Sequence, residues 1–342
     1  MVKTFCSQPV EITDVYPDVS VIIAAYNAEH TIGRAIRSAL DQDGVSVEVI
    51  VVDDKSSDGT TAVARSFSQP NIKVLQLAKN AGPGHARNVA VDAARGRWIA
   101  VLDADDEMSP DRLSTMLKRA ENAGAVIAVD NIGVIDNGNG KSYQMFPTSR
   151  LEELGKITLP MFIASNLVFG STFNYGYMKP VFRRDFVQDS HLRYDENLRI
   201  GEDYLFLASM LASGGECIVE PAAGYSYHVH AGSISRTLKH HHVSSMIEAD
   251  ALFLSRFQFD SQAKSAQARR TRNLEEVRNF LILVDHIKRG SVHNIVKMAF
   301  DDPAAFRFLY MPIGVRIKRL IPSFMSRNPF PKHGRTKQQS GV

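Results

Sequence analysis

Cysteine is almost absent from this chain, since Cys6 and Cys217 are the only two thiols in 342 residues. Two thiols so far apart give neither a disulfide framework nor the paired spacing of a zinc site. Their scarcity is typical of a reducing compartment, so we expect a cytoplasmic protein. The first twenty residues lack the apolar core of a signal peptide. No apolar run reaches the roughly 18–20 residues that a membrane-spanning helix needs.

The sequence also lacks the signatures of several nucleotide- and nucleic-acid-binding classes. The net charge is only +3, so composition indicates no nucleic acid as a partner. Neither G-x-G-x-x-G nor G-x-x-x-x-G-K-[ST] occurs, which argues against a dinucleotide dehydrogenase and a Walker-type ATPase. With 44% hydrophobic residues, the chain has ample material for a globular core.

What the sequence does contain is an alternation of apolar runs with amphipathic segments. Runs that are apolar throughout predict parallel strands covered on both faces, at residues 19–26, 47–52, 72–77 and 98–102. The segments between and after them have helical spacing, at residues 28–42, 60–67, 86–94 and 110–122. Asn27 is the expected N-cap of the first helix. This alternation predicts an α/β fold with a mostly parallel central sheet and flanking helices.

The alternation weakens after residue 125. We expect a strand near 125–134, a long connection without clear periodicity over 136–175, a strand at 177–182, a helix at 203–212 and short strands within 217–227. Four parts follow from this pattern: a lead-in (1–18), an α/β domain (19–238, with halves 19–124 and 125–238), a helical C-terminal region (239–325) and a basic flexible tail (326–342).

Acidic residues are concentrated where the fourth predicted strand ends. Asp103, Asp105 and Asp106 stand together there, and like charges so close repel one another unless a cation lies between them. Carboxylate oxygens suit Mg²⁺ or Mn²⁺, which could neutralise the charge that develops on a departing diphosphate. The alternative is a solvated turn in which Asp106 or Ser109 caps the next helix.

Other polar clusters follow the second and third strands. Asp53 and Asp54 could accept hydrogen bonds from a base or a ribose, or could simply build a turn. Arg87 follows a Gly-Pro-Gly turn at a helix start, where it could bridge a diphosphate or lie on the surface. Because ligands of open α/β sheets bind beyond the carboxyl ends of the strands, all these clusters would line one crevice.

Glu202 and Asp203 stand about a hundred residues further on, at a predicted helix start. Acids at that position complement the helix dipole, which is the simpler interpretation. A carboxylate in a crevice can also remove a proton from a substrate hydroxyl.

Taken together, these motifs resemble the family-2 glycosyltransferases, whose fold is called GT-A. The matching segments are 21–27 (VIIAAYN), 51–60 (VVDDKSSDGT), 80–88 (NAGPGHARN), 102–106 (LDADD) and 201–203 (GED). The resemblance covers about residues 19–235 and extends, less specifically, to rhizobial exopolysaccharide glucosyltransferases of the succinoglycan type. It implies inverting transfer of a hexose, with UDP-glucose as the expected donor, to a lipid-linked oligosaccharide.

The resemblance also implies roles for single residues. Ala24 and Tyr26 would lie at the nucleotide base, Asp54 would bind the polar edge of uracil, and Arg87 would lie near the diphosphate. Asp103 and Asp105 would meet the ribose and the metal, with Asp105 as the more direct ligand.

On the acceptor side, Asp203 would be the catalytic base, and Glu202 would help to hold the acceptor. His230 precedes a Gly-Ser-x-Ser segment that lies near the metal and diphosphate in the family. His228 and His230 are two residues apart, so on a strand they would share a face. A pair of structural histidines is the alternative.

The C-terminal third is basic and helical in pattern. Residues 306–321 interleave apolar side chains with Arg307, Arg316, Lys318 and Arg319. A basic amphipathic helix of this kind could lie on an anionic membrane surface, such as the cytoplasmic face of the inner membrane, which would suit a lipid-linked acceptor. An ordinary packed helix with a frayed tail is the alternative.

Two other functions stay open at this point. A sugar-nucleotide nucleotidyltransferase uses a similar sheet, but it would need a Gly-rich loop bearing Arg or Lys directly after the first strand. This chain has 26–30 (YNAEH) there. A non-catalytic protein of polysaccharide assembly is the second alternative, and the intact carboxylates do not support it.

Overall fold

The computed structural model describes residues 16–309 except 137, 139, 171–172 and 230–237. Most of the predicted lead-in, His230 and the tail beyond residue 309 lie outside the described residues. The chain divides into two compact units, Met1–Arg278 and Asn279–Val342.

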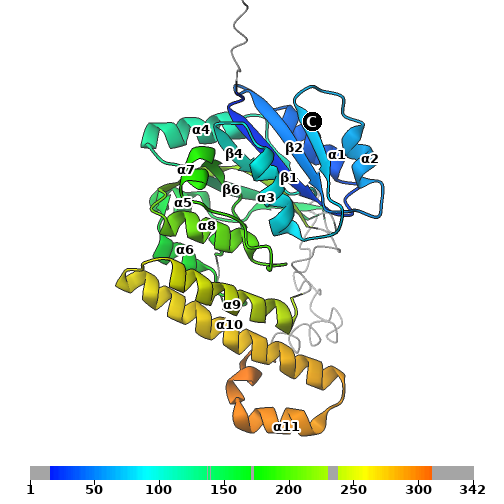
Figure 1. Cartoon of the computed structure of the whole chain (residues 1–342). Helices are drawn as coiled ribbons and strands as arrows, with labels where there is room; N and C mark the ends of the chain where they lie inside the picture. The colour runs from blue at the N-terminus through cyan, green and yellow to red at the C-terminus, as the bar shows by residue number, and fades with distance from the viewer. Residues whose placement is uncertain (1–15, 137, 139, 171–172, 230–237, 310–342) are drawn as a thin grey trace, which may run out of the picture. The chain divides into compact units, whose positions relative to one another are not determined.

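Four parallel strands form the first half of the sheet, in the order β3-β2-β1-β4 (Figure 1). They are β1 (Val19–Ala25), β2 (Val47–Asp53), β3 (Ile72–Gln76) and β4 (Trp98–Val101). The helices of this half are α1 (Ile32–Leu40), α2 (Thr60–Arg65), α3 (Pro83–Ala93) and α4 (Arg112–Ala123). All four strands lie within one residue of their predicted bounds, and β1, β2 and β4 are apolar runs buried on both faces, whereas β3 is only partly buried.

The first helix begins later than predicted, and Asn27 is not its N-cap. Asn27 has a left-handed backbone with φ of 50°, and its side-chain oxygen accepts a hydrogen bond of 2.8 Å from the backbone N–H of Ser57. Asparagine tolerates this conformation better than most residues. Asn27 thus joins the loops after β1 and β2 instead of starting α1 at residue 28.

The second half of the sheet is mixed and continues from β4 in the order β9-β6-β10-β5. Its strands are β5 (Glu107–Met108), β6 (Ile127–Asp136), β9 (Val181–Arg183) and β10 (Cys217–Val229), with β7 (Lys141–Gln144) beside β6 and β8 (Lys156–Ile157) beside β10. β9 runs antiparallel to both β4 and β6, so β6 and β10 point the same way as β4. The predicted α/β fold with a mostly parallel sheet is confirmed.

The connection predicted over 136–175 contains short elements that the sequence pattern did not indicate. They include β7, β8, α5 (Thr148–Leu154) and α6 (Leu159–Ser165). Each is seven residues or shorter, too short for a periodicity to be recognised. Buried Phe146, Leu151 and Phe162 anchor this segment to the core.

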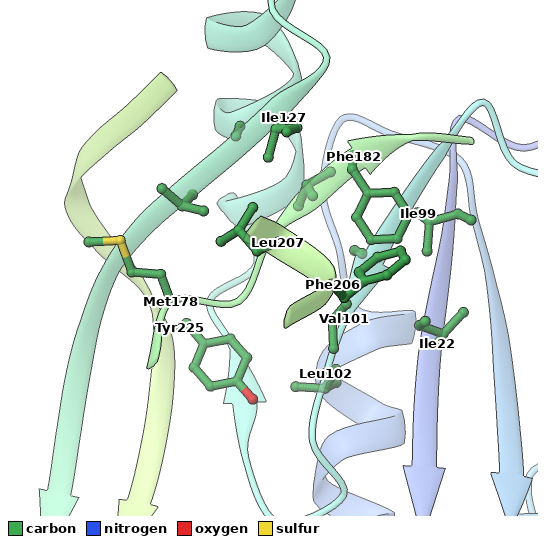
Figure 2. Close-up of a cluster of buried hydrophobic side chains, with 14 of the residues drawn as sticks. Ile22, Ile99, Val101, Leu102, Ile127, Met178, Phe182, Phe206, Leu207 and Tyr225 are labelled. Atoms are coloured by element: carbon green, nitrogen blue, oxygen red, sulfur yellow. The ribbon is translucent and has the colours of Figure 1, made fainter. Parts of the chain in front are cut away.

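A cluster of aromatic and aliphatic side chains fixes α8 (Glu202–Ala212) against the middle of the sheet (Figure 2). Phe206 on α8 meets Phe182 on β9 edge to face, with ring centroids 5.5 Å apart. Ile99 on β4 lies beside them in Figure 2. Such aromatic packing is directional as well as apolar, so it fixes the position of α8 against the sheet.

The helical C-terminal region starts within the first unit. α9 (His240–Arg256) and the first part of α10 (Ser261–Lys288) are joined by a buried ion pair, Arg270 Nε to Asp250 Oδ2, at 2.9 Å. The Arg270 guanidinium also lies 3.7 Å from the ring centroid of Tyr204 on α8. These helices therefore pack on the α/β core.

The second unit contains the end of α10, α11 (Val292–Asp301) and a 3-10 segment, Pro303–Leu309. The rings of Phe280 and Phe308 meet there at 5.7 Å. Most of the basic amphipathic helix predicted over 306–321 lies outside the described residues. Within the described ranges, no helix combines the length and apolar character required to traverse a bilayer.

Candidate active site

β10 fixes the acidic loop that follows β4. The hydroxyl of Tyr225 accepts from the backbone N–H of Asp103 (3.1 Å) and donates to Asp106 Oδ2 (2.7 Å). Asp106 Oδ1 accepts from the backbone N–H of His228 (2.9 Å). One tyrosine and one strand thus determine the path of residues 103–106.

Asp103, Asp105 and Asp106 present carboxylate oxygens within 4.8 Å of one another. Burial, with repulsion from Asp103 and Asp105, raises the pKa of Asp106 to about 8, although the His228 N–H and the Tyr225 hydroxyl oppose the shift. A cation stabilises carboxylates that lie this close together, and oxygen donors suit Mg²⁺ or Mn²⁺. The donor set fits a hard divalent ion.

Both oxygens of Asp103 already contact cationic side chains. Arg87 Nη2 lies 2.9 Å from Oδ1, and Lys179 Nζ lies 2.7 Å from Oδ2. Burial opposes ionisation, but the two cations outweigh it and lower the pKa of Asp103 to about 2. Asp103 could therefore reach a metal ion only by sharing an oxygen with one of these cations.

Arg87 is buried on α3 and contacts acids from both halves of the domain. Its Nη1 lies 2.6 Å from Glu202 Oε1 and 3.2 Å from Asp203 Oδ1, while its Nη2 contacts Asp103. Burial disfavours its charge, yet the three acids raise its pKa. Its planar fork matches two carboxylates at once. The residue predicted near the diphosphate is thus held by acids in the described structure.

Glu202 and Asp203 form the first turn of α8, which starts after Gly201. The φ of Gly201 is 94°, a conformation that glycine adopts without strain. Burial and the neighbouring Asp203 raise the pKa of Glu202, against the attraction of Arg87. Asp203 Oδ2 lies 2.9 Å from Lys179 Nζ, and its side chain is 24% exposed. Since Lys179 also contacts Asp103, the structure brings the acids at 103 and 203 to one ammonium group.

The acids that follow β2 have different partners. Asp54 accepts hydrogen bonds from the backbone N–H groups of Ala81 (2.7 Å) and Gly82 (2.8 Å), which holds the loop before α3. At the end of β1, Tyr26 is 49% exposed and Ala24 is half-buried. An exposed ring at a strand end is available for stacking on a base. The nucleotide-binding roles of Ala24, Tyr26 and Asp54 stay predictions.

His230 lies outside the described residues, so its predicted position near the metal is not addressed. Its neighbour His228 is buried, with Nε2 at 3.0 Å from Glu107 Oε1. The sequence motifs missed two other residues that contact these acids, Lys179 and Tyr225. Neither belongs to an acidic or glycine-rich motif. Lys179 reaches the acids because β9 pairs with β4, and Tyr225 reaches them because β10 pairs with β6.

Comparison with known proteins identifies the family. A model described as glycosyl transferase family 2 matches residues 20–186. The chain is 52% identical over 312 residues to "Succinoglycan biosynthesis protein ExoO" of Rhizobium meliloti, covering 91% of this chain and 89% of that protein. It is 35% identical over 278 residues to "Succinoglycan biosynthesis protein ExoU" of the same organism, covering 78% and 79%. This chain belongs to glycosyltransferase family 2.

Solved structures of this family share the fold. The crystal structure of S. aureus TarS 1–349 in complex with UDP-GlcNAc matches with a TM-score of 0.60 at 20% identity, over 84% of this chain and 92% of that one. The same protein in complex with UDP matches with a TM-score of 0.56 at 22% identity, over 83% and 72%. The GT-A architecture predicted from the motifs is confirmed, and the family assignment displaces the nucleotidyltransferase alternative.

Proposed function

We propose that this glycosyltransferase is an inverting, metal-dependent hexosyltransferase of bacterial exopolysaccharide synthesis, which moves glucose from UDP-glucose to a lipid-linked oligosaccharide. The observation that carries the proposal is the meeting of Asp103, at the end of β4, with Asp203, at the start of α8, through one shared lysine. The similarity to two succinoglycan biosynthesis proteins supports the pathway, and the TarS complexes support a UDP-linked donor.

The chemistry needs one base. Asp203, a quarter exposed, removes the proton from the acceptor hydroxyl as that oxygen attacks the anomeric carbon. The bond from the anomeric carbon to the diphosphate oxygen breaks on the opposite side, so an α-linked donor gives a β-linked product. A retaining hydrolase would place a second carboxylate as nucleophile, whereas Glu202 is buried and paired with Arg87 here.

The leaving diphosphate needs positive charge. A divalent ion, when bound, neutralises the charge that develops there, and Asp105 with Asp103 would hold it. Arg87 and Lys179 neutralise Asp103 and Asp203 from the protein side. The charge of the diphosphate would therefore be the main charge that the ion neutralises.

The second unit supports contact with a lipid surface. Val292, Val296 and Phe300 are spaced four residues apart on α11 and are 68%, 49% and 84% exposed. Lys297 on the same helix is exposed. An apolar stripe flanked by positive charge is typical of helices that lie in an anionic bilayer interface. We place this contact on the cytoplasmic face of the inner membrane.

Vesicle sedimentation tests the membrane contact. Val296→Asp should lower binding to vesicles that contain anionic lipid several-fold, because the new charge enters the apolar stripe. Asn294→Asp adds the same charge to the same helix at an exposed polar position and should bind more tightly than Val296→Asp. Equal binding by both variants, or no wild-type binding to these vesicles, would remove α11 as the contact.

A donor screen tests the transfer reaction. The full chain is mixed with Mn²⁺, a panel of nucleotide sugars and lipid extract from exopolysaccharide-producing bacteria, and released UDP or GDP is measured. We expect release from UDP-glucose, dependence on the lipid extract, and loss of release when EDTA removes the metal. Release that persists in EDTA would contradict metal dependence, and a different preferred donor would replace glucose in the proposal.

A further inference from the structure

Lys179 stands between two acids that come from different halves of the domain. Its Nζ is 2.7 Å from Oδ2 of Asp103 and 2.9 Å from Oδ2 of Asp203. Its side chain is only 11% exposed, so salt and water screen these contacts weakly. Burial opposes the charge of Lys179, but attraction to Asp103 and Asp203 outweighs it and raises its pKa. The bridging group thus lies within hydrogen-bonding distance of both carboxylates.

The backbone of Lys179 is fixed as firmly as its ammonium. Arg112 Nη2 donates to the Lys179 carbonyl at 2.7 Å. Arg112 is itself fully buried, and its guanidinium makes two hydrogen bonds of 2.8 Å to Asp130 on β6. The next carbonyl, of Pro180, accepts from the N–H of Val101 at the end of β4 (3.3 Å). Because both its carbonyl and its ammonium are held, Lys179 can restrain the carboxylates of Asp103 and Asp203.

Arg87 does not duplicate this contact. It donates hydrogen bonds to Glu202 and Asp103, and it approaches Asp203 Oδ1 only at 3.2 Å. Lys179, by contrast, donates a hydrogen bond to Asp203 Oδ2. The orientation of the Asp203 carboxylate therefore depends on Lys179 more than on Arg87.

We propose that Lys179 is a positioning residue for the transfer reaction. Its ammonium holds the Asp203 carboxylate at a fixed place relative to Asp103, so that the base faces the acceptor hydroxyl once the donor has bound beside Asp103. This role rests on the proposed function, in which Asp203 is the base. Lys179 acts through the two acids and does not itself take up a proton.

The proposal predicts a separation of kcat from KM. Lys179→Met leaves Asp103 held by Arg87 but frees the Asp203 carboxylate, and a misplacement of about 1 Å can lower the rate about 10²-fold. We expect kcat to fall about 100-fold while KM for UDP-glucose changes less than about threefold. Lys179→Arg keeps a cation that can bridge two carboxylates and should retain more activity than Lys179→Met.

Chemical rescue separates positioning from folding. Lys179→Cys is purified and treated with 2-bromoethylamine, so that the sulfur displaces bromide and an ammonium of nearly lysine length is restored. UDP release from UDP-glucose with the lipid extract is measured before and after treatment. The treated wild-type protein and the exposed Lys118→Met variant are controls and should match the untreated wild type.

The outcomes are distinct. Recovery of kcat on aminoethylation supports the role of Lys179, because the polypeptide is the same before and after. A folded Lys179→Cys whose kcat does not rise, a Lys179→Met whose kcat stays within twofold of wild type, or a loss confined to KM contradicts it. A wild-type chain that releases no nucleotide from any donor contradicts the proposed function itself.

Discussion

Aspartates stand at the ends of β2 and β4, but their partners differ. Asp53 is fully buried and accepts hydrogen bonds from Ser56, Thr61 and Gln76, which are neutral groups from the loop after β2, from α2 and from β3. Asp103 is paired instead with the cations of Arg87 and Lys179, which arrive from α3 and from the segment before β9. The Asp53 cluster stabilises a loop, whereas the Asp103 cluster brings together charged groups of the proposed active site.

The largest expected effects come from replacing one carboxylate in each cluster: Asp203, which shares Lys179 with Asp103, and Asp53. Asp203→Asn keeps the shape of the base but cannot take a proton, so kcat should fall about 10²–10⁴-fold. Thermal stability should fall less, because Arg87 and Lys179 keep Asp103 as a partner. UDP release and calorimetry measure the two effects.

The same substitution in the other cluster should act in the opposite way. Asp53→Asn loses acceptor capacity for several buried donors, so the free energy of unfolding should fall by about 1–3 kcal/mol. The folded fraction should keep kcat within about tenfold of wild type. If Asp53→Asn kept the free energy of unfolding of the wild type but lost as much kcat as Asp203→Asn, the two clusters would not differ in function.

The raised pKa of Asp106 makes the free energy of unfolding depend on pH. In the folded protein this carboxyl keeps its proton up to about pH 8, whereas its ordinary value is 3.8. Between these values the folded state binds more protons than the unfolded state, so Asp106 makes the free energy of unfolding fall as pH rises. Asp103 has the opposite shift, to about 2, so its stabilisation is lost only as pH falls below about 4.

Asp106→Asn has no proton to lose, so its stability should depend less on pH than that of wild type between pH 5 and 8. Urea unfolding at several pH values, in EDTA, measures the slope. The exposed Asp111→Asn is the matched control and should keep the wild-type slope. Parallel slopes for wild type and Asp106→Asn would mean that Asp106 is ionised throughout.

The sequence alone predicted the strands and the acids at their ends, but not the partners of those acids. β1 to β4 are apolar runs with short connections, so local pattern identified them, and the rule of strand ends placed the acids at one edge. Lys179 was missed because a lysine is ordinarily solvated and nothing local distinguishes it. It reaches Asp103 only because β9 enters the sheet antiparallel beside β4, a pairing between residues about eighty apart.

Tyr225 and Arg112 were missed for a related reason. Both have polar groups whose partners lie on other elements: the Tyr225 hydroxyl on β10 donates to Asp106 in the loop after β4, and Arg112 on α4 pairs with Asp130 on β6. Buried polar groups are chosen by the partner that satisfies them, and that partner is known only once the topology is known. The family motifs predicted the acids, whereas the residues that orient them were found only from the fold.

The smallest expected effect lies in the loop-building cluster. Thr61→Val removes one hydroxyl donor to Asp53 but keeps the shape of the side chain, so the free energy of unfolding should fall by about 1 kcal/mol. The exposed Thr115→Val on α4 makes the same chemical change away from any acid cluster and should cost less. Because Asp53 retains its contacts with Ser56 and Gln76, kcat should be unchanged in both variants. A tenfold loss of kcat in Thr61→Val would show that the loop after β2 takes part in the reaction and is not only its support.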